Sequence, residues 1–366
     1  MPSFPTSNLS VDLTEYTENE IYSYPSTGVR VFLTLILAVV FILSLSGNLL
    51  IFGIIYRRAA MRSGINLLLA NLALADLVTS VFTLPLSAIV LNMQSWRFGS
   101  VMCKLSGVVY SLVNAEKVFV LLVISIDRYF IIVKRRDTMT PPKAKAFIAL
   151  SWLVVIVLSL PPVFGWGRFV YKCGFVQCLL DFNEQSQFNP SYTIFYCTAI
   201  IFVPSFVLVV IYHCILRKLR RNSFRVQNHP PVTPTAMHKK GKLFIDYSYK
   251  TRTSTTILLL SLVFIVCTVP IGGVNVYLAL NGFNDRINTR GYLAFLWISH
   301  AHGAFNPIIY YTRIKKFRES VRDLWPQFCV LPHLVPIRSR RRIRPHVMYR
   351  VEKNDKIVIM NSNSSL

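Results

Sequence analysis

Residues 31–56 read VFLTLILAVVFILSLSGNLLIFGIIY and contain no charged side chain. A helix needs about 20 apolar residues to cross the hydrocarbon layer of a membrane, so this stretch is long enough to span it. Only helices and closed barrels satisfy their backbone polar groups in lipid, and continuous rather than alternating apolar runs indicate helices. The pattern predicts an all-α membrane protein with a seven-transmembrane helix bundle over residues 30–312. Six further apolar blocks complete that count, at residues 65–93, 101–133, 146–164, 191–216, 253–280 and 291–312.

The composition of the whole chain supports this interpretation. Hydrophobic residues make up 53% of the 366 residues, and charged residues only 15%. The alternative, a large soluble protein with buried helices, rarely produces seven apolar blocks of this length. No metal-binding cluster, phosphate-binding loop or nucleophile arrangement stands out in the sequence, so we expect neither an enzyme nor a bound cofactor.

The basic residues predict the orientation of the helices. With the N-terminus outside, the inner loops and tail carry 31 of the 40 Lys and Arg residues. We expect a multi-pass plasma-membrane protein with an extracellular tail at residues 1–29 and a cytoplasmic tail at residues 326–366. Attraction to anionic membrane lipids explains the net charge of +24. Nucleic-acid binding would call for one folded basic domain, whereas here the charge lies on short loops.

An amphipathic segment at residues 313–325 follows the seventh block. Pro326 ends the pattern, and a helix lying along the inner membrane surface fits it best. Cys329, just beyond, is a candidate for palmitoylation, with an unmodified thiol as the alternative. The apolar residues of the segment recur at helical spacing between basic ones, at Ile314, Phe317, Val321 and Leu324.

Three cysteines lie on the predicted outer side, where thiols oxidise: Cys103, Cys173 and Cys178. One disulfide is expected, and the sequence alone permits three pairings. The outer tail also contains Asn8-Leu9-Ser10, which has the form of an N-glycosylation acceptor.

The polar and proline residues of the blocks form an ordered set of motifs. Together they resemble the rhodopsin-like G-protein-coupled receptors over about residues 30–325. A narrower resemblance, to a small orphan subgroup once proposed to sense lysophospholipids, rests on residues 59–63, 124–128 and 312–317 and on the tail motif at residues 341–345. The wider set comprises Gly47-Asn48, Leu72-Ala73-Leu74-Ala75-Asp76, Cys103, Asp127-Arg128-Tyr129, Trp152, Pro204, Tyr212, Phe264, Cys267, Pro270 and Asn306-Pro307-Ile308-Ile309-Tyr310.

The resemblance implies partners and roles. A disulfide between Cys103 and Cys178 would tie the third helix to the second outer loop. Arg128 would contact a heterotrimeric G protein once helix six swings outward, and arrestin and receptor kinases would be further partners. The implied activation switch consists of Asp127, Arg128, Tyr129, Tyr212, Asn306, Pro307 and Tyr310.

Two positions depart from the family pattern in helix six. Thr268 stands two residues before Pro270, where the family usually has Trp, and Lys250 stands where the family often has Glu. Both changes indicate a weakly held resting state.

Lys117 is the most informative departure, because a charge in a membrane span needs a partner. Lys117 precedes Arg128 by 11 residues, about 16 Å along a helix. Asp76 lies 11 residues beyond Ile65, near the inner start of helix two, and so at a similar depth. In the family, Asp76 and a small hydroxyl residue at the Lys117 position help hold a sodium ion. We expect Lys117 to pair with Asp76 and replace that ion; the alternatives are a pair with Glu116, a deprotonated amine or an amine in a water-filled cavity.

The ligand cavity is expected between the outer halves of helices three, five, six and seven. Tyr110 stands where amine receptors carry Asp, and His300 where opsins carry the retinal Lys, so neither ligand class fits. The outer face lacks a dense basic cluster, which disfavours a strongly anionic ligand. The candidate lining residues are Tyr110, Ser111, Asn114, Asn275 and His300, each of which has an alternative role in interhelical hydrogen bonding.

The sequence therefore predicts a G-protein-coupled receptor with an unknown small extracellular ligand, for which a lipid-like molecule is one candidate. A receptor with high basal activity and no dedicated ligand is the second interpretation, suggested by Thr268, Lys117 and Lys250. A small-solute transporter is the alternative from another class, although the internal repeats that many transporters show are absent from the sequence.

Overall fold

A computed structural model describes residues 25–136, 139–172, 174–181, 188–228, 234–282, 289–314 and 317–323. Side chains are not described at residues 60, 188–189, 222–250 and 289–290. The chain divides into Met1–Asp323 and Leu324–Leu366, and the second of these units lies wholly outside the described residues.

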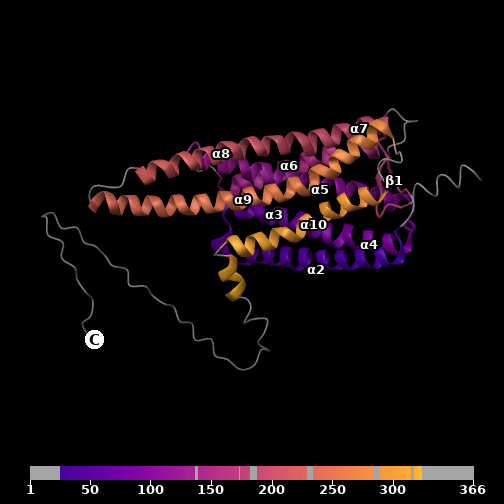
Figure 1. The fold of residues 1–366 in the computed structure, drawn as a ribbon, viewed down its shortest axis with the longest axis horizontal. Helices are drawn as coiled ribbons and strands as arrows, with labels where there is room; N and C mark the ends of the chain where they lie inside the picture. Colours follow the sequence, from indigo (N-terminus) through magenta and orange to yellow (C-terminus); the bar gives the residue numbers. More distant parts are fainter. Residues whose placement is uncertain are drawn as a thin grey trace, which may run out of the picture. The chain divides into compact units, whose positions relative to one another are not determined.

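The described part consists of long helices that run roughly along one common direction (Figure 1). Two of the membrane-crossing segments are interrupted by wider π-type turns, η2 (Thr79–Thr83) and η4 (Cys197–Phe202). The helices are α2 (Thr27–Arg57), α3 (Gly64–Val78), α4 (Leu84–Met93), α5 (Gly99–Ile132), α6 (Pro141–Ser159), α7 (Phe188–Tyr196), α8 (Val203–Asn228), α9 (Pro234–Asn281) and α10 (Thr289–Arg313), with short 3₁₀ turns η1 (Ala59–Met61) and η3 (Pro161–Val163).

These helices occupy all seven predicted blocks, with α3, η2 and α4 forming one span and α7, η4 and α8 another. Six spans in the described part are long and apolar enough to cross a membrane. The seventh helix, α10, is more polar because it carries His300, His302 and Asn306. Several helices exceed the apolar blocks, and α9 begins at Pro234 in the third inner loop, since a helix can continue into water beyond the lipid.

α5 is the central helix of the bundle and packs against α3, α6, α8 and α9. α10 packs against α2 and α9, so the chain closes on its first span. Buried polar residues gather along α5, from Ser106 near its outer end to Arg128 near its inner end. This placement puts the charged residues of helix three where the other helices can supply partners.

The second outer loop forms a two-stranded antiparallel hairpin of β1 (Phe169–Val170) and β2 (Leu179–Leu180). A disulfide joins Cys103 of α5 to Cys178 beside β2, which confirms the expected pairing. Cys173, the third outer cysteine, lies outside the described residues. Phe175 and Val176, within the hairpin loop, are fully buried in an apolar cluster with side chains of α9 and α10.

The amphipathic segment after α10 is helical over residues 317–323. Phe317 is buried, and its ring lies 6.2 Å from that of Tyr310. Arg58, which caps the inner end of α2, donates to Ser320 Oγ at 3.1 Å and pairs with Asp323 at 3.2 Å. These contacts seat the segment against the inner ends of α2 and α10; residues 315–316 and 324–325 of the predicted helix lie outside the described part.

Candidate functional site

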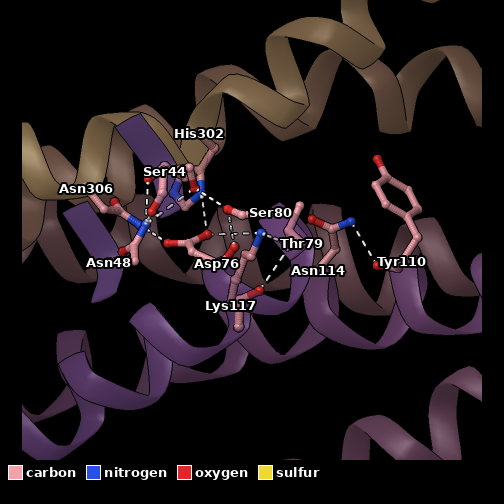
Figure 2. A network of polar contacts seen from close by, with 12 residues as sticks. Ser44, Asn48, Asp76, Thr79, Ser80, Tyr110, Asn114, Lys117, His302 and Asn306 are labelled. Carbon is pink, nitrogen blue, oxygen red and sulfur yellow. Dashed lines mark hydrogen bonds and ion pairs between the residues drawn. The ribbon is translucent and has the colours of Figure 1, made fainter. Parts of the chain in front are cut away.

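The centre of the bundle contains a buried ion pair between α3 and α5. The Lys117 ammonium lies 3.1 Å from Asp76 Oδ1, and the two side chains are 4% and 0% exposed. Lys117 also donates a hydrogen bond to Thr79 Oγ1 at 2.9 Å. Thr79 opens the η2 turn, one helical turn beyond Asp76, so both acceptors of the ammonium come from the same helix (Figure 2).

A polar network surrounds Asp76 and joins it to α2 and α10 (Figure 2). Asn306 of the Asn306-Pro307 motif donates to Asp76 Oδ2 at 2.6 Å. Ser80 donates to the Asp76 carbonyl at 2.8 Å and lies 2.7 Å from Ser44 of α2. Asn48 of α2 donates to the carbonyl of Gly303 at 3.0 Å. The network therefore ties four spans together through one carboxylate and its neighbours.

Gly303 allows α10 to approach this network closely. A Cβ at this position would lie 2.7 Å from Ser44 Oγ and 3.2 Å from Asp76 Oδ1, which is too close for a side chain. His302, beside it, is buried with its Nδ1 3.8 Å from Asp76 Oδ1, and its ring stands edge-on to that of Phe264 in α9. His302 therefore connects the Asp76 carboxylate to helix six through its ring contact with Phe264.

These residues do not fit the bound sodium ion that the family resemblance implies. The Lys117 ammonium already pairs with Asp76, and the neighbouring Thr79 hydroxyl accepts a hydrogen bond from it. A sodium ion against Asp76 would face an ammonium group on the same carboxylate. Within the described ranges, no group of three or more His, Cys, Asp or Glu residues is arranged to hold a metal ion.

Glu116 belongs to a separate cluster, because neighbouring residues on a helix point about 100° apart. Its Oε1 accepts hydrogen bonds from Asn71 at 2.5 Å and from Ser151 of α6 at 2.8 Å. Trp152 of α6 donates its indole N–H to Asn71 Oδ1 at 3.0 Å. Glu116 is fully buried, and in the part of the chain that the structure describes no Lys or Arg forms an ion pair with it. The structure therefore places Lys117 against Asp76 and not against Glu116.

The inner end of α5 carries Asp127-Arg128-Tyr129. Arg128 is buried and donates to Asp127 Oδ2 at 2.6 Å. Tyr212 of α8 lies 2.7 Å from Ser125 Oγ, one turn above Arg128. The Tyr310 ring packs near Phe317, with ring centroids 6.2 Å apart. Arg128 is held by its neighbour in the sequence.

Three of the five predicted ligand-pocket residues meet at Tyr110, whereas Ser111 and Asn275 make other contacts. Tyr110 stacks edge-on against His300, with ring centroids 5.7 Å apart. Asn114 donates to the Tyr110 carbonyl at 2.9 Å, and the Ser111 carbonyl accepts from Tyr196 at 2.6 Å.

Asn275 contacts Tyr292, a residue that packs against the second outer loop. It accepts a hydrogen bond from the Tyr292 hydroxyl at 3.1 Å, and the Tyr292 ring stands edge-on to Phe175 at 4.9 Å. The hairpin loop therefore reaches the outer ends of helices six and seven, beside a predicted lining residue.

The comparison with known families decides the class of protein. Residues 47–310 match the family "7 transmembrane receptor (rhodopsin family)". The chain belongs to this family. It is a G-protein-coupled receptor and not an enzyme, and its ligand is unknown.

Individual relatives of this receptor cover nearly the whole chain. It is 36% identical to "High-affinity lysophosphatidic acid receptor" from Xenopus laevis, covering 88% of this chain and 90% of that protein. It is 35% identical to "Probable G-protein coupled receptor 45" from Homo sapiens, with 90% and 91% covered. The fold matches the crystal structure of squid rhodopsin with a TM-score of 0.74 at 20% identity, covering 86% of this chain and 90% of that one.

Some residues of the receptor's core network were absent from the predicted sites. Thr79 stands three residues after Asp76, a helical spacing that would have placed it beside Lys117. Ser44 and His302 offered no such signal, because Ser80 and Asp76 lie on other helices. Asn48 belongs to the Gly47-Asn48 motif, to which no site role was assigned. Asn8, Cys329 and the side chain of Lys250 lie outside the described residues, so their predicted roles stay predictions.

Proposed function

We propose that this receptor lies in the plasma membrane with its N-terminus outside and its C-terminus in the cytoplasm, and passes an extracellular signal to a heterotrimeric G protein. Support for this orientation comes from the basic inner loops and tail. Arrestin and receptor kinases are further partners by family resemblance. The transporter alternative has no comparable support, because the relatives that cover the chain are receptors.

The observation that carries the mechanism is the Lys117–Asp76 pair. In our proposal the Lys117 ammonium replaces a bound sodium ion, because it supplies the positive charge between α3 and α5. Asn306 shares the carboxylate with Lys117, so inward movement of α10 changes the geometry of the pair. A receptor built in this way shifts between two packings of the same network, without the release of an ion.

The inner end supports the coupling part of the proposal. Arg128 is buried against Asp127 and has to leave this contact to reach a G protein. Tyr212 is held by Ser125 and by Ser261 of α9, at 2.7 and 3.3 Å. An outward swing of α9 would remove Ser261 from Tyr212 and free the hydroxyl for Arg128.

For the ligand, we infer an uncharged or weakly polar molecule. The predicted lining residues are neutral amides, hydroxyls and aromatic rings, with Tyr110 and His300 in contact. One relative's name refers to lysophosphatidic acid, whose phosphate needs a cationic partner. In the outer loop that the structure describes, Arg168 and Lys172 share one carboxylate, Asp181, at 2.8 and 3.4 Å, which offsets one of their two positive charges.

Basal activity without a dedicated ligand is the second candidate, and the hairpin loop favours it. Phe175 and Val176 are fully buried among side chains of helices six and seven, where a ligand would otherwise make contact. Thr268 also replaces the large aromatic residue that the family uses near this level. In this view the receptor's own loop takes the ligand's place.

The experiment that tests the proposal is ligand-free second-messenger output in cells, at matched surface expression. The intact receptor is compared with Arg128→Ala, which removes the coupling residue, and with Lys117→Ser, which removes the ammonium. Output that Arg128→Ala abolishes and Lys117→Ser alters supports a self-active receptor governed by the core pair. If the intact receptor is silent, a ligand screen on the same cells replaces the basal readout; a response that survives Arg128→Ala would contradict the coupling proposal.

A further inference from the structure

A hollow of about 410 Å³ lies on the surface at the inner end of α6. Its α6 lining follows helical spacing, so Lys143 and the apolar residues after it share one face of the helix. All of these α6 side chains are exposed, and no described part of the chain covers them. The lining residues are Met139, Lys143, Ala146, Phe147 and Leu150.

We propose that this hollow binds one anionic phospholipid of the inner leaflet, with its phosphate against Lys143 and an acyl chain along α6. The depth of Lys143 fits this role. The span Pro141–Val163 has 23 residues, a length of about 34 Å, which slightly exceeds the hydrocarbon thickness of about 30 Å. Lys143 is close to the start of this span and therefore lies at the level of the headgroups.

The exposed face of α6 continues the hollow as an apolar track. Phe147, Leu150, Leu153 and Val157 are 41%, 54%, 61% and 64% exposed. They follow one another at three- and four-residue steps, so they form one stripe. From Phe147 to Val157 the stripe is about 15 Å long, half of the hydrocarbon layer, which matches an acyl chain of one leaflet.

The charge of the surrounding loop favours an anionic headgroup. Residues 134–145 contain five basic residues and one acidic residue, Asp137. Such a segment beside the membrane attracts anionic lipids of the cytoplasmic leaflet. Lys145 lies two residues beyond Lys143, about 200° around the helix, and does not line the hollow. Only Lys143 combines a positive charge with the apolar track.

Met139, which lines the hollow, connects it to the start of α3. Met139 approaches the start of α3 so closely that a Cβ on Gly64 would lie 2.8 Å from its carbonyl oxygen. A lipid in the hollow therefore contacts an inner loop that is pinned to α3, between α6 and the end of α5 that carries Arg128. Occupancy of the hollow would stabilise one position of this loop.

The test is native mass spectrometry of the purified full-length receptor with phosphatidylserine or phosphatidylcholine of the same acyl chains. We expect retained phosphatidylserine adducts that Lys143→Ala reduces about fivefold, the order expected for one Lys near an anionic surface. Ala146→Trp fills the hollow without changing the charge and should reduce them equally. Lys145→Ala is the matched control and should change them less than about twofold, because its charge faces elsewhere.

Two outcomes would overturn the proposal. Equal retention of both lipids would show that the headgroup charge is not recognised. Equal losses in Lys143→Ala and Lys145→Ala would show general attraction to the basic loop and no built site. Thermal unfolding of each variant establishes that it is folded, and because the readout is bound lipid, the result is independent of whether the receptor couples to a G protein.

Discussion

Asn306 donates a hydrogen bond to Asp76 across 2.6 Å, although 230 residues separate the two in the sequence. The same carboxylate pairs with Lys117 through its other oxygen at 3.1 Å. Helix seven and helix three therefore bind different oxygens of one buried carboxylate. A movement of either helix changes the electrostatic environment of the other, so helices two, three and seven are linked through Asp76 at the centre of the bundle.

Loss of one partner of this pair should destabilise the receptor strongly. Lys117→Met leaves the Asp76 carboxylate buried with Asn306 as its remaining close donor, and breaking a buried ion pair on one side costs about 3–5 kcal/mol. The double variant Lys117→Met/Asp76→Asn removes both charges and should recover most of the lost thermal stability. The measurement is the thermal unfolding midpoint of detergent-purified receptor.

The control for these charge-removing variants is Lys104→Met, at an exposed position on the outer part of α5. It removes one positive charge from α5 without unpairing a buried carboxylate, so we expect little change in the midpoint. If the double variant is no more stable than Lys117→Met alone, the two charges do not act as a pair.

Sodium should have no allosteric effect on the intact receptor. The ammonium occupies the position that a cation would need, so signalling or unfolding measured in sodium chloride and in choline chloride at equal ionic strength should agree. Lys117→Ser replaces the ammonium with a small hydroxyl beside Asp76 and Thr79, and should gain a dependence on sodium. A clear sodium effect on the intact receptor would falsify the idea that Lys117 replaces the ion.

The positions of the spans could be predicted from the sequence, because length and apolar continuity are local properties. The first block, residues 31–56, differs from α2 by four residues at one end and one at the other. The π-type turns at Thr79 and Cys197 could not be predicted, since they depend on packing and leave no pattern in composition. The π-type turn that begins at Thr79 follows directly on the helix that carries Asp76, and such turns are frequent at functional sites.

The core site was predictable only in part. The pairing of Lys117 was predictable because a charge in a membrane span needs a partner, and the residue spacing places Asp76 at a similar depth. Depth alone did not distinguish Asp76 from Glu116, because that choice depends on how α5 is rotated against α3 and α6. The role of His302 could not be predicted, because its partners Asp76 and Phe264 lie on two other helices.

Glu116 should behave as a hydrogen-bond acceptor and not as half of an ion pair. Glu116→Gln keeps an oxygen for Asn71 and Ser151, so the thermal midpoint should fall only slightly. Glu116→Ala leaves the buried Asn71 amide without its acceptor, which costs about 1–3 kcal/mol, whereas Ser151 still donates to the Ile148 carbonyl at 2.9 Å. Comparing the two midpoints separates the roles: equal losses would mean that the negative charge, absent from both variants, is what matters.

The buried hairpin loop should control basal output. Phe175→Ala empties a site that contacts Tyr292 and the outer ends of helices six and seven, and the truncation of a buried Phe costs about 3–5 kcal/mol in a well-packed core. If the loop acts in place of a ligand, this variant lowers ligand-free second-messenger output at matched surface expression. If the loop instead blocks an external ligand, output stays at its basal level or rises. Phe164→Ala is the matched control, because Phe164 is 83% exposed near the start of the same loop and should leave the output unchanged.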